Sequence, residues 1–563
     1  MSDLQTRRTN LLRRQVALWT ERASWDSQAL DISRYILPRA GRFQTTEVNK
    51  GLKKDQSILD STGRLSHRTL AAGMMSGITS PARPWFKLGL HDKELMEFGP
   101  VKLWLSRTSD LMRAVFAESN TYNALHSCYE ELGAFGTWAN IVEPHFGNVI
   151  HHYPLTFGEY ALACDDEGRV DTMFRRLRMT VGQLVKKFGI ANVSSAVKNL
   201  HNRNVLDAWV EVYHIIEPRE DVDNTKLDAK NMAFASIYME SGANENKFLR
   251  ESGYKRFRGL APRWVVTGND IYGRSPAMDA LGDVKQLQHM SLRKAQAIDL
   301  KVNPPLQIPT QLKDKANARM PGGASYYDAT GPGAGIRSAY EVNLDLSHLL
   351  ADIQDTRERI KSAFYADLFL MLANDTRSGI TATEVAERHE EKLLMLGPVL
   401  ERLDNELLSP LIDITFDQLA EAKVLPPIPD ELRDVELDVE FIGTLAQAQR
   451  MIASSGVERF ATFVGQLAAA KGDPSVWDKV NTDQMVDEYG TAVGINPALI
   501  VPDDDAEAVR AQREQQMAAQ QAAAAAPALA DTAKTVSDID TGNLRDVMAG
   551  LTGYASGTPA YAG

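Results

Sequence analysis

Apolar residues recur every three or four positions along several long stretches of the chain, the spacing that places them on one face of an α-helix. Arginines and acidic residues fill the positions between them, as expected for helices with one solvated face. Four such stretches lie in the first quarter of the chain, at 4–36, 57–79, 99–118 and 121–134. The first is followed by Leu37-Pro38 and the second by Pro81 and Pro84, which end helices.

The pattern then changes to one typical of β-strands. Residues 159–179 predict two strands around the turn Asp165-Asp166-Glu167-Gly168. Further strands are expected at 208–216, 233–240 and 263–267. The three adjacent carboxylates could suggest a metal site, but at a turn they more often form a solvated loop tip. The first half is therefore expected to be α+β.

From residue 276 the chain predicts a long helix, a compact module and a second long helix. Apolar residues at helical spacing fill 276–303, a length of about 40 Å. Residues 304–343 are rich in Pro and Gly and suit short strands and loops, whereas 344–372 return to the helical pattern. A polar loop at 373–380 follows.

The remainder of the chain is expected to be mainly helical, with one strand. Thr381 and Glu384 form a capping box that starts a helix, and a kink or break is expected at Gly397-Pro398. Residues 435–441 alternate as in a half-exposed strand, and helix returns from 443 to about 500. The Ala-rich end is expected to be a helix without a large apolar face, followed by a mobile tail.

The stretch GMMSGITSP (73–81) raises the possibility of a catalytic serine. A hydrolase elbow reads G-x-S-x-G, but here Ser76 lies directly before Gly77, so the template fails. Small residues at these positions would instead let another backbone approach the helix closely. Ser76 is therefore interpreted as structural.

Length and composition narrow the classes of protein. At 563 residues the chain should contain several subdomains. Its net charge of −12 argues against tight nucleic-acid binding, although residues 1–68 carry a local excess of cations. No window approaches the roughly 20 apolar residues of a membrane span, and the arginine-rich start does not resemble an export signal. Cys128 and Cys164 are expected to be reduced thiols.

Searches for catalytic and ligand-binding motifs give negative predictions. The chain has no G-x-x-x-x-G-K-[ST] sequence, and at 389–393 Leu393 replaces the second histidine of H-E-x-x-H. His151-His152 is interpreted as a structural or surface pair. The aromatic and basic segment 254–264 fits an exposed strand better than a single-strand binder. We therefore expect no enzyme activity, no cofactor and no metal site.

Five segments together resemble the head-to-tail connector, or portal, proteins of short-tailed bacteriophages. They are LDSTGRLSHRTLAAGMMSGITSPARPWFKL (59–88), DEGRVDTMFRRLRMTVGQLVKKFG (166–189), GNDIYGRSPAMDALGDVKQLQHM (268–290), TATEVAERHEEKLLMLGPVLERLDNELLSPLI (381–412) and GTLAQAQR (443–450). They occur in the family's order and span most of the chain, without the Ala-rich tail.

The resemblance implies an α+β, mainly α, portal fold. Its parts would be the wing (1–275), stem helix 1 (276–303), the clip (304–343), stem helix 2 (344–372), a tunnel loop (373–380), the wing return and crown base (381–500), and a helical crown with a mobile tail (501–563). Channel candidates in the tunnel loop are Asn374, Asp375, Thr376, Arg377 and Ser378. Docking candidates in the clip are Gln307, Lys313, Lys315, Arg319, Tyr326 and Tyr327.

The resemblance also implies a function and partners. Copies of the chain would form a ring, twelve in the family, at one capsid vertex of the virion, after assembly in the host cytoplasm. Double-stranded DNA would pass through the channel during packaging and ejection. The terminase large subunit, tail adaptor and tail tube proteins, and capsid and scaffolding proteins would be partners, with no membrane involved. Two alternatives are a ring-shaped motor enzyme and a non-ring scaffolding or interaction protein.

Overall fold

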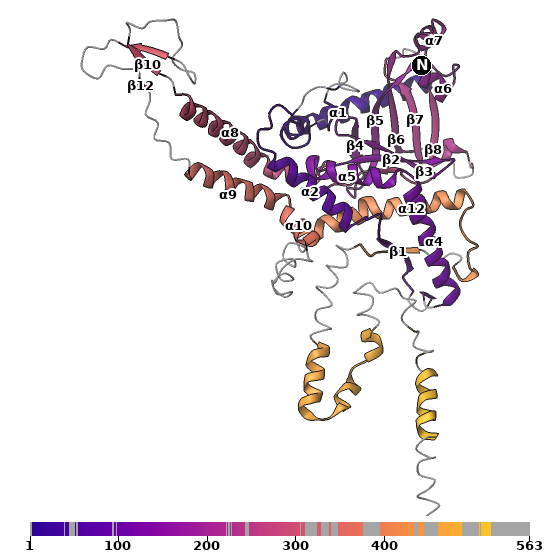
Figure 1. The fold of residues 1–563 in the computed structure, drawn as a ribbon. Coiled ribbons are helices and arrows are strands. Elements are labelled where there is room, and N and C mark those ends of the chain that lie inside the picture. Colours follow the sequence, from indigo (N-terminus) through magenta and orange to yellow (C-terminus); the bar gives the residue numbers. More distant parts are fainter. Residues whose placement is uncertain are drawn as a thin grey trace, which may run out of the picture. The chain divides into compact units, whose positions relative to one another are not determined.

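The computed structural model describes most of the chain up to residue 443 and shorter segments beyond it (Figure 1). The described residues are 3–38, 40–43, 51, 55–92, 95–96, 98–220, 222, 226, 228–242, 247–304, 306–309, 324–327, 337–338, 347–374, 395–432, 437–443, 460–486, 501, 506 and 508–519. They belong to two compact units, Met1–Ala453 and Ser454–Gly563.

The largest sheet has five antiparallel strands in the order β4-β5-β6-β7-β8. Its strands are β4 (Tyr160–Cys164), β5 (Val170–Thr180), β6 (Trp209–Pro218), β7 (Phe234–Glu240) and β8 (Arg250–Tyr254). The expected hairpin is confirmed: β4 and β5 pair across a turn in which Gly168 has the left-handed φ of 80°. Asp166 and Glu167 are exposed at its tip, in line with a solvated turn.

Helix α1 (Asp3–Tyr35) packs on this sheet. Leu11 and Leu18 of the helix join Phe174, Ile215 and Ile237 of the strands in one buried cluster. The sheet therefore covers part of the apolar face that the sequence pattern predicts, whereas Leu4 and Val16 are exposed and Ile32 and Ile36 join the main core. Helices α6 (Val181–Phe188) and α7 (Ser195–Asn202) follow β5.

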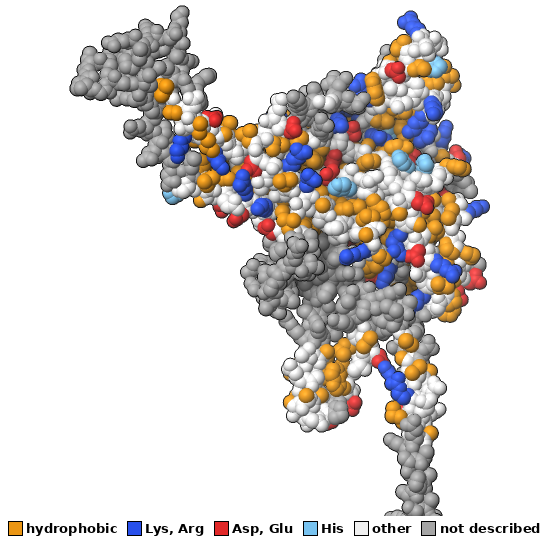
Figure 2. All heavy atoms as spheres, in the orientation of Figure 1, with side chains coloured by type: hydrophobic (Ala, Val, Ile, Leu, Met, Phe, Trp, Pro, Cys, Tyr) orange, Lys and Arg blue, Asp and Glu red, His pale blue; other side chains and the backbone are white. Residues whose placement is uncertain are grey.

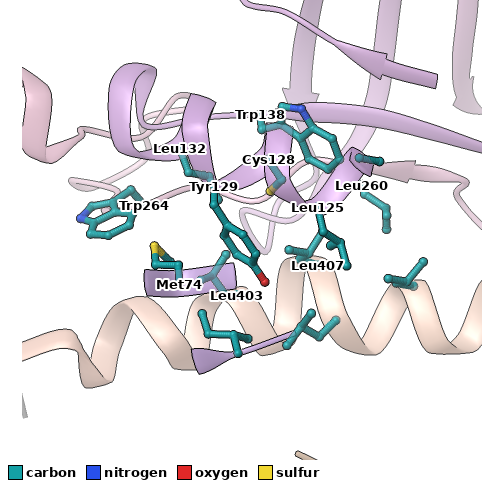
Figure 3. Close-up of a cluster of buried hydrophobic side chains, with 14 of the residues drawn as sticks. Met74, Leu125, Cys128, Tyr129, Leu132, Trp138, Leu260, Trp264, Leu403 and Leu407 are labelled. Atoms are coloured by element: carbon teal, nitrogen blue, oxygen red, sulfur yellow. The ribbon is translucent and has the colours of Figure 1, made fainter. Parts of the chain in front are cut away.

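The main core joins helices from both halves of unit 1 (Figure 3). Met74 of α2 (Thr62–Gly77) and Tyr129 of α5 (Thr121–Phe135) meet Leu403 and Leu407 from a helical segment at 395–408. The buried Tyr129 hydroxyl lies 2.9 Å from the Thr79 hydroxyl, so its polar atom has a partner. Helix α4 (Gly99–Glu118) matches the predicted range.

Two small sheets flank this core. Strand β2 (Ala139–His145) pairs with β3 (Val149–Leu155) and with β9 (Gly259–Leu260). Strand β1 (Phe86–Leu90) pairs with β13 (Leu437–Phe441), which confirms the half-exposed strand expected near 435–441.

The structure corrects several predicted elements. Residues 263–267 do not form a strand and make only the isolated bridges Thr137↔Arg263 and Val265↔Arg274. The single helix expected over 344–372 is two helices, α9 (Ser347–Ala363) and α10 (Ala366–Asn374), because Tyr365 adopts a left-handed φ of 52°. The described residues 395–403 are helical through Gly397-Pro398 without a break, and the helix then widens into a π-helical turn at Asp404–Leu408 before α12 (Ser409–Glu421).

The second unit has helical residues at 460–471, a 3₁₀ segment at Pro474–Lys479 and helical residues at 482–486 and 508–519. An Arg510–Asp483 ion pair joins the last two of these segments. The capping box at Thr381 and Glu384 lies outside the described residues. The fold class is therefore confirmed as mixed α+β with more helix than strand. Of the helices described, none has both the length and the apolar character of a membrane span.

Candidate functional site

The predicted sequence of long helix, compact module and long helix is present as α8 (Pro276–Val302), three short strands and α9. We call α8, the three strands and α9 together the arm. The two helices lie side by side (Figure 1). Strand β10 (Leu306–Pro309) pairs in parallel with β11 (Ala324–Tyr327) and antiparallel with β12 (Arg337–Ser338).

Helix α8 is buried only over its first half. Its start is fixed by Ser275, whose hydroxyl accepts a hydrogen bond from Met278 N at 3.1 Å and donates to Ala134 O at 2.6 Å. Buried positions continue to Gln288, whereas from Ser291 to Val302 no residue is buried. The exposed half carries large apolar side chains, at Leu292, Ile298, Leu300 and Val302. The distal arm thus offers apolar surface that unit 1 does not cover.

A buried polar node anchors the arm to the chain just before α2. The Gln288 side-chain oxygen accepts from the backbone N–H groups of Leu59 and Asp60 at 2.6 and 2.8 Å, and its amide nitrogen donates to Asp60 O at 2.9 Å. The Asp60 carboxylate accepts from Thr62 and, at 3.1 and 2.7 Å, from Arg357 of α9. Asp60, two residues before the start of α2, is therefore bonded to both arm helices.

The charge state of Asp60 favours this node. Burial alone would raise the pKa of the carboxyl group, but hydrogen bonds from Thr62 and the pairing with Arg357 outweigh it and lower the pKa. Asp60 is 9% exposed, so its ion pair with Arg357 is far less screened than a surface pair. Two further pairs support the arm, Lys285–Asp31 at 2.7 Å and Arg359–Asp283 at 3.6 Å.

Small residues of α2 form the second anchor. A Cβ atom at Gly63 would lie 3.0 Å from a methyl group of Val284 in α8, and one at Gly73 would collide with Phe369 of α10. Ser76 is exposed and donates to Gly73 O at 3.0 Å. The interpretation of the 73–81 stretch as a close-packing surface is therefore confirmed, with α10 as the helix that it receives.

The arm helices carry mixed charge rather than an excess of acid. Helix α8 has four Lys or Arg and three Asp, and α9 has three cations and three acids. The net charge of −12 is thus not concentrated on these two helices.

The predicted docking residues divide into two groups. Gln307 is half-buried in β10, opposite Ser325 and Arg337, and Tyr326 and Tyr327 lie in the adjacent β11. The structure thus brings these three together on one small sheet. Lys313, Lys315 and Arg319 lie outside the described residues. Of the predicted loop residues, Asn374 ends α10, and Asp375, Thr376, Arg377 and Ser378 lie outside the described part.

Two other sequence candidates have structural roles. In the basic segment at 254–264, Lys255 pairs with Glu421 at 3.1 Å and Arg256 with Asp413 at 2.9 Å, which binds these cations to α12. His152 is buried, with its ring nitrogens 2.9 Å from Thr121 Oγ1 and 2.8 Å from Asn140 Nδ2. Burial, followed by the neighbouring His151, lowers the pKa of His152 to about 3. Within the described residues no group of His, Cys, Asp and Glu has the arrangement of a metal site.

Sequence reasoning missed the ion pair that fixes the π-helical turn. Arg263 donates from Nη2 to Glu406 at 2.6 Å, and its backbone N–H donates to the same carboxylate at 2.8 Å. The guanidinium also donates to Gly168 O at 2.8 Å, at the tip of the β4–β5 hairpin. Nothing in the sequence joins residues 263 and 406, which are 143 positions apart.

Comparison with known proteins gives a family match over nearly the whole chain. The family described as "Bacteriophage head to tail connecting protein" matches residues 8–501. The "Probable portal protein" of Bordetella phage BPP-1 is 56% identical over 553 residues, covering 98% of this chain and 99% of the relative. The "Portal protein" of Salmonella phage epsilon15 is 44% identical and covers 95% and 96%. That of Enterobacteria phage T3 is 22% identical and covers 89% of each.

Proposed function

The chain belongs to the bacteriophage head-to-tail connecting proteins, and we propose from this premise that copies of it form a ring at one vertex of a phage head. Double-stranded DNA passes through the ring's axis during packaging and ejection. The observation that carries the proposal is the similarity to portal proteins at 56% and 44% identity over nearly the full chain. The alternative is a non-ring scaffolding or interaction protein of virion assembly.

In this proposal the arm forms the stem and clip around the channel. A closed ring needs two different surfaces on each copy that fit each other after a rotation. The exposed large apolar residues of α8, with Leu350 of α9, support the arm as part of such a surface. Exposed apolar side chains grouped on one element are typical of protein–protein contact sites. We assign residues 373–380 to the tunnel loop, whose first two residues form the end of α10.

Partners dock at the two ends of the ring. The strands with Gln307, Tyr326 and Tyr327 are the proposed docking surface for the terminase large subunit and later for tail adaptor proteins. Capsid and scaffolding proteins contact the rest of the virion-embedded ring, which assembles in the host cytoplasm. The chain itself is structural and hydrolyses no nucleotide.

Imaging and sizing of the purified full-length chain test the ring. Negative-stain electron microscopy should show annular particles with a central hole, and light scattering should give a mass many times 62.2 kDa. Particles that remain at the mass of one chain under every assembly condition would support the scaffolding alternative. A phosphate-release assay with ATP separates a passive ring from a motor enzyme, since only the motor releases phosphate.

The loop residues have their own test. Arg377→Ala should weaken DNA retention in assembled particles, and replacement of 374–378 by glycines should weaken it further. Arg169→Ala, at the exposed tip of the β4–β5 turn, is the control and should retain DNA normally. Normal retention by both loop variants would remove the loop from the proposal without affecting the ring.

A further inference from the structure

Several arginines around the five-stranded sheet pair with acidic partners. Arg7 and Arg219 pair with Glu251 at 2.7 and 3.2 Å, and Arg14 pairs with Glu217 at 2.9 Å. A surface organised in this way leaves little free positive charge. A group of cations on the same sheet without acidic partners therefore indicates a different role.

Three cations lack such an acidic partner: Arg175 of β5, Lys187 of α6 and Arg250 of β8, which we call the basic cluster. Arg175 and Arg250 lie in one row across the sheet, with His214 and Tyr238 between them. The three cations meet around two tyrosine rings. Lys187 and Arg250 each lie 5.0 Å from the ring centre of Tyr238, and Arg175 lies 5.4 Å from that of Tyr153. None of the three forms an ion pair within 4 Å with a described residue. Figure 2 shows Lys and Arg side chains gathered on this side of the molecule, near the histidines.

Glu143 and Glu159 both act on the charge of Arg175, but neither forms an ion pair with the basic cluster among the described residues. Glu143 of β2 accepts a hydrogen bond from the Tyr254 hydroxyl at 2.8 Å and a longer one from Tyr238 at 3.5 Å. The Nε atom of Arg175 is buried and has no hydrogen-bond partner in the described structure. Burial, and then the neighbouring Arg250 and Arg175, lower the pKa of Lys187 despite the opposing effect of Glu143. The three like charges therefore repel one another, and an incoming anion would relieve the repulsion.

The surroundings favour carboxylates of a protein over phosphates of a nucleic acid. Single-stranded nucleic acids bind where bases stack on free aromatic faces beside cations. Here the Tyr238 ring has cations against it and is also stacked on His214 at a ring-centre distance of 3.8 Å, so its faces are occupied.

An exposed apolar residue stands at the tip of the β2–β3 hairpin, whose Tyr153 contacts the cluster. Phe146, at the tip of the β2–β3 hairpin, is fully exposed. The tip is held in shape because His145 Nδ1 accepts hydrogen bonds from the backbone N–H groups of Gly147 and Asn148 at 3.3 and 3.1 Å. Ring contacts lead from His145 through His151 to Tyr153, which lies under Arg175. A phenylalanine presented at the tip of the hairpin that carries Tyr153 suits an extended segment with both acidic and apolar side chains.

We propose that Arg175, Lys187 and Arg250, together with Phe146 at the tip of the β2–β3 hairpin, form a docking site for an acidic segment of a partner protein. Carboxylates of the segment bind the cations, and an apolar side chain of the segment packs on Phe146. The helices and strands that form this site are not those of the arm, and the proposal does not depend on the proposed ring or channel.

The test measures binding of a fluorescein-labelled peptide of glutamates with one central leucine to the full-length chain by fluorescence anisotropy. Lys187→Glu and Arg250→Glu should each weaken binding by about tenfold or more, because they place a like charge opposite the peptide. The matched control is Lys186→Glu, an equal charge change one residue away that contacts neither ring; it should change affinity by less than about twofold. Phe146→Ser should also weaken binding, and added salt should weaken it for the wild type.

Several outcomes would overturn the proposal. An oligothymidine of similar charge that binds more tightly than the peptide, and loses affinity in Lys187→Glu, would identify a nucleic-acid site instead. Equal losses in Lys186→Glu and Lys187→Glu would indicate general charge attraction, and no binding by the wild type at low salt would remove the site. Circular dichroism checks the fold of each variant. The neutral double variant Lys187→Gln/Arg250→Gln removes both positive charges without adding a negative charge that would repel the peptide. It should lose at least as much affinity as removal of either cation alone.

Discussion

Replacing Gly73 by alanine tests whether the small-residue surface of α2 receives α10. Two effects of the change oppose each other. In an open helix position, alanine is more favourable than glycine by about 1 kcal/mol. At Gly73, however, the new Cβ would lie 2.7 Å from the Cβ atom of Phe369 and closer still to its ring. Carbon atoms in contact normally stay about 3.5–4.0 Å apart.

The clash cannot be removed by rotating the Phe369 ring, because the Cβ atom of Phe369 is fixed to the backbone of α10. The helices must move apart by about 1 Å, and overpacking of this kind costs about 1–3 kcal/mol. Steric cost should therefore exceed the gain in helix propensity, so Gly73→Ala should be less stable than the wild type.

Gly282 of α8 provides a matched control, since a Cβ there would have no atom within 4 Å. Gly282→Ala should be stabilised, and the two variants should differ by the steric cost alone, about 1–3 kcal/mol in free energy of unfolding, because both gain the same helix propensity. Urea unfolding followed by circular dichroism measures the shift, and hydrogen exchange should show faster exchange in α10 for Gly73→Ala alone. In a double-mutant cycle with Phe369→Ala, the two changes should be strongly non-additive. Equal stability of the two glycine variants would refute the reasoning.

Three further changes probe the polar interactions. Glu406→Ala leaves the buried Arg263 without its carboxylate and should cost about 3–5 kcal/mol in urea unfolding, whereas Glu406→Gln should cost less; equal losses would mean that the charge is unimportant. His152 has a pKa lowered to about 3 in the folded state, so the stability it confers is present above pH 6.5 and is lost as the pH falls below 6.5. His152→Gln should flatten the decline in melting temperature over this range, and an unchanged pH profile would contradict the assignment. Asp60→Asn removes the charge opposite Arg357 and should speed hydrogen exchange in α9 by about tenfold, or about 1.4 kcal/mol; unchanged exchange would show that the node does not hold the arm.

The helices could be predicted because their apolar positions repeat at 3.6 residues and one face is buried. Strand β2 (Ala139–His145) was missed because its first four residues are all buried, so it shows no alternation. Strand β8 (Arg250–Tyr254) is short and largely polar, which resembles a loop. The break at Tyr365 carries neither Gly nor Pro, so it has no local signal. Tertiary packing, rather than local preference, decides these elements.

For the candidate site, the order of helix, strands and helix could be predicted from periodicity and Pro and Gly content. Its anchors could not, because Gln288 and Asp60 are 228 positions apart in the chain. The glycines of α2 did give a signal, since small residues on a helix predict close approach of another element. The signal did not identify which element approaches, and the structure supplies α8 and α10.

The contacts of α2 explain why the arm and the segment after it should move as one body. Gln288 and Arg357 hold α8 and α9 to the residues just before α2, and Phe369 packs on Gly73 within it. The buried face of α2, in turn, joins the main core through Met74. Displacing the arm would therefore have to break buried hydrogen bonds and separate packed helices, both of which cost more than bending an exposed loop. A force applied along the arm is thus transmitted to the core through α2 as well as through the buried first half of α8.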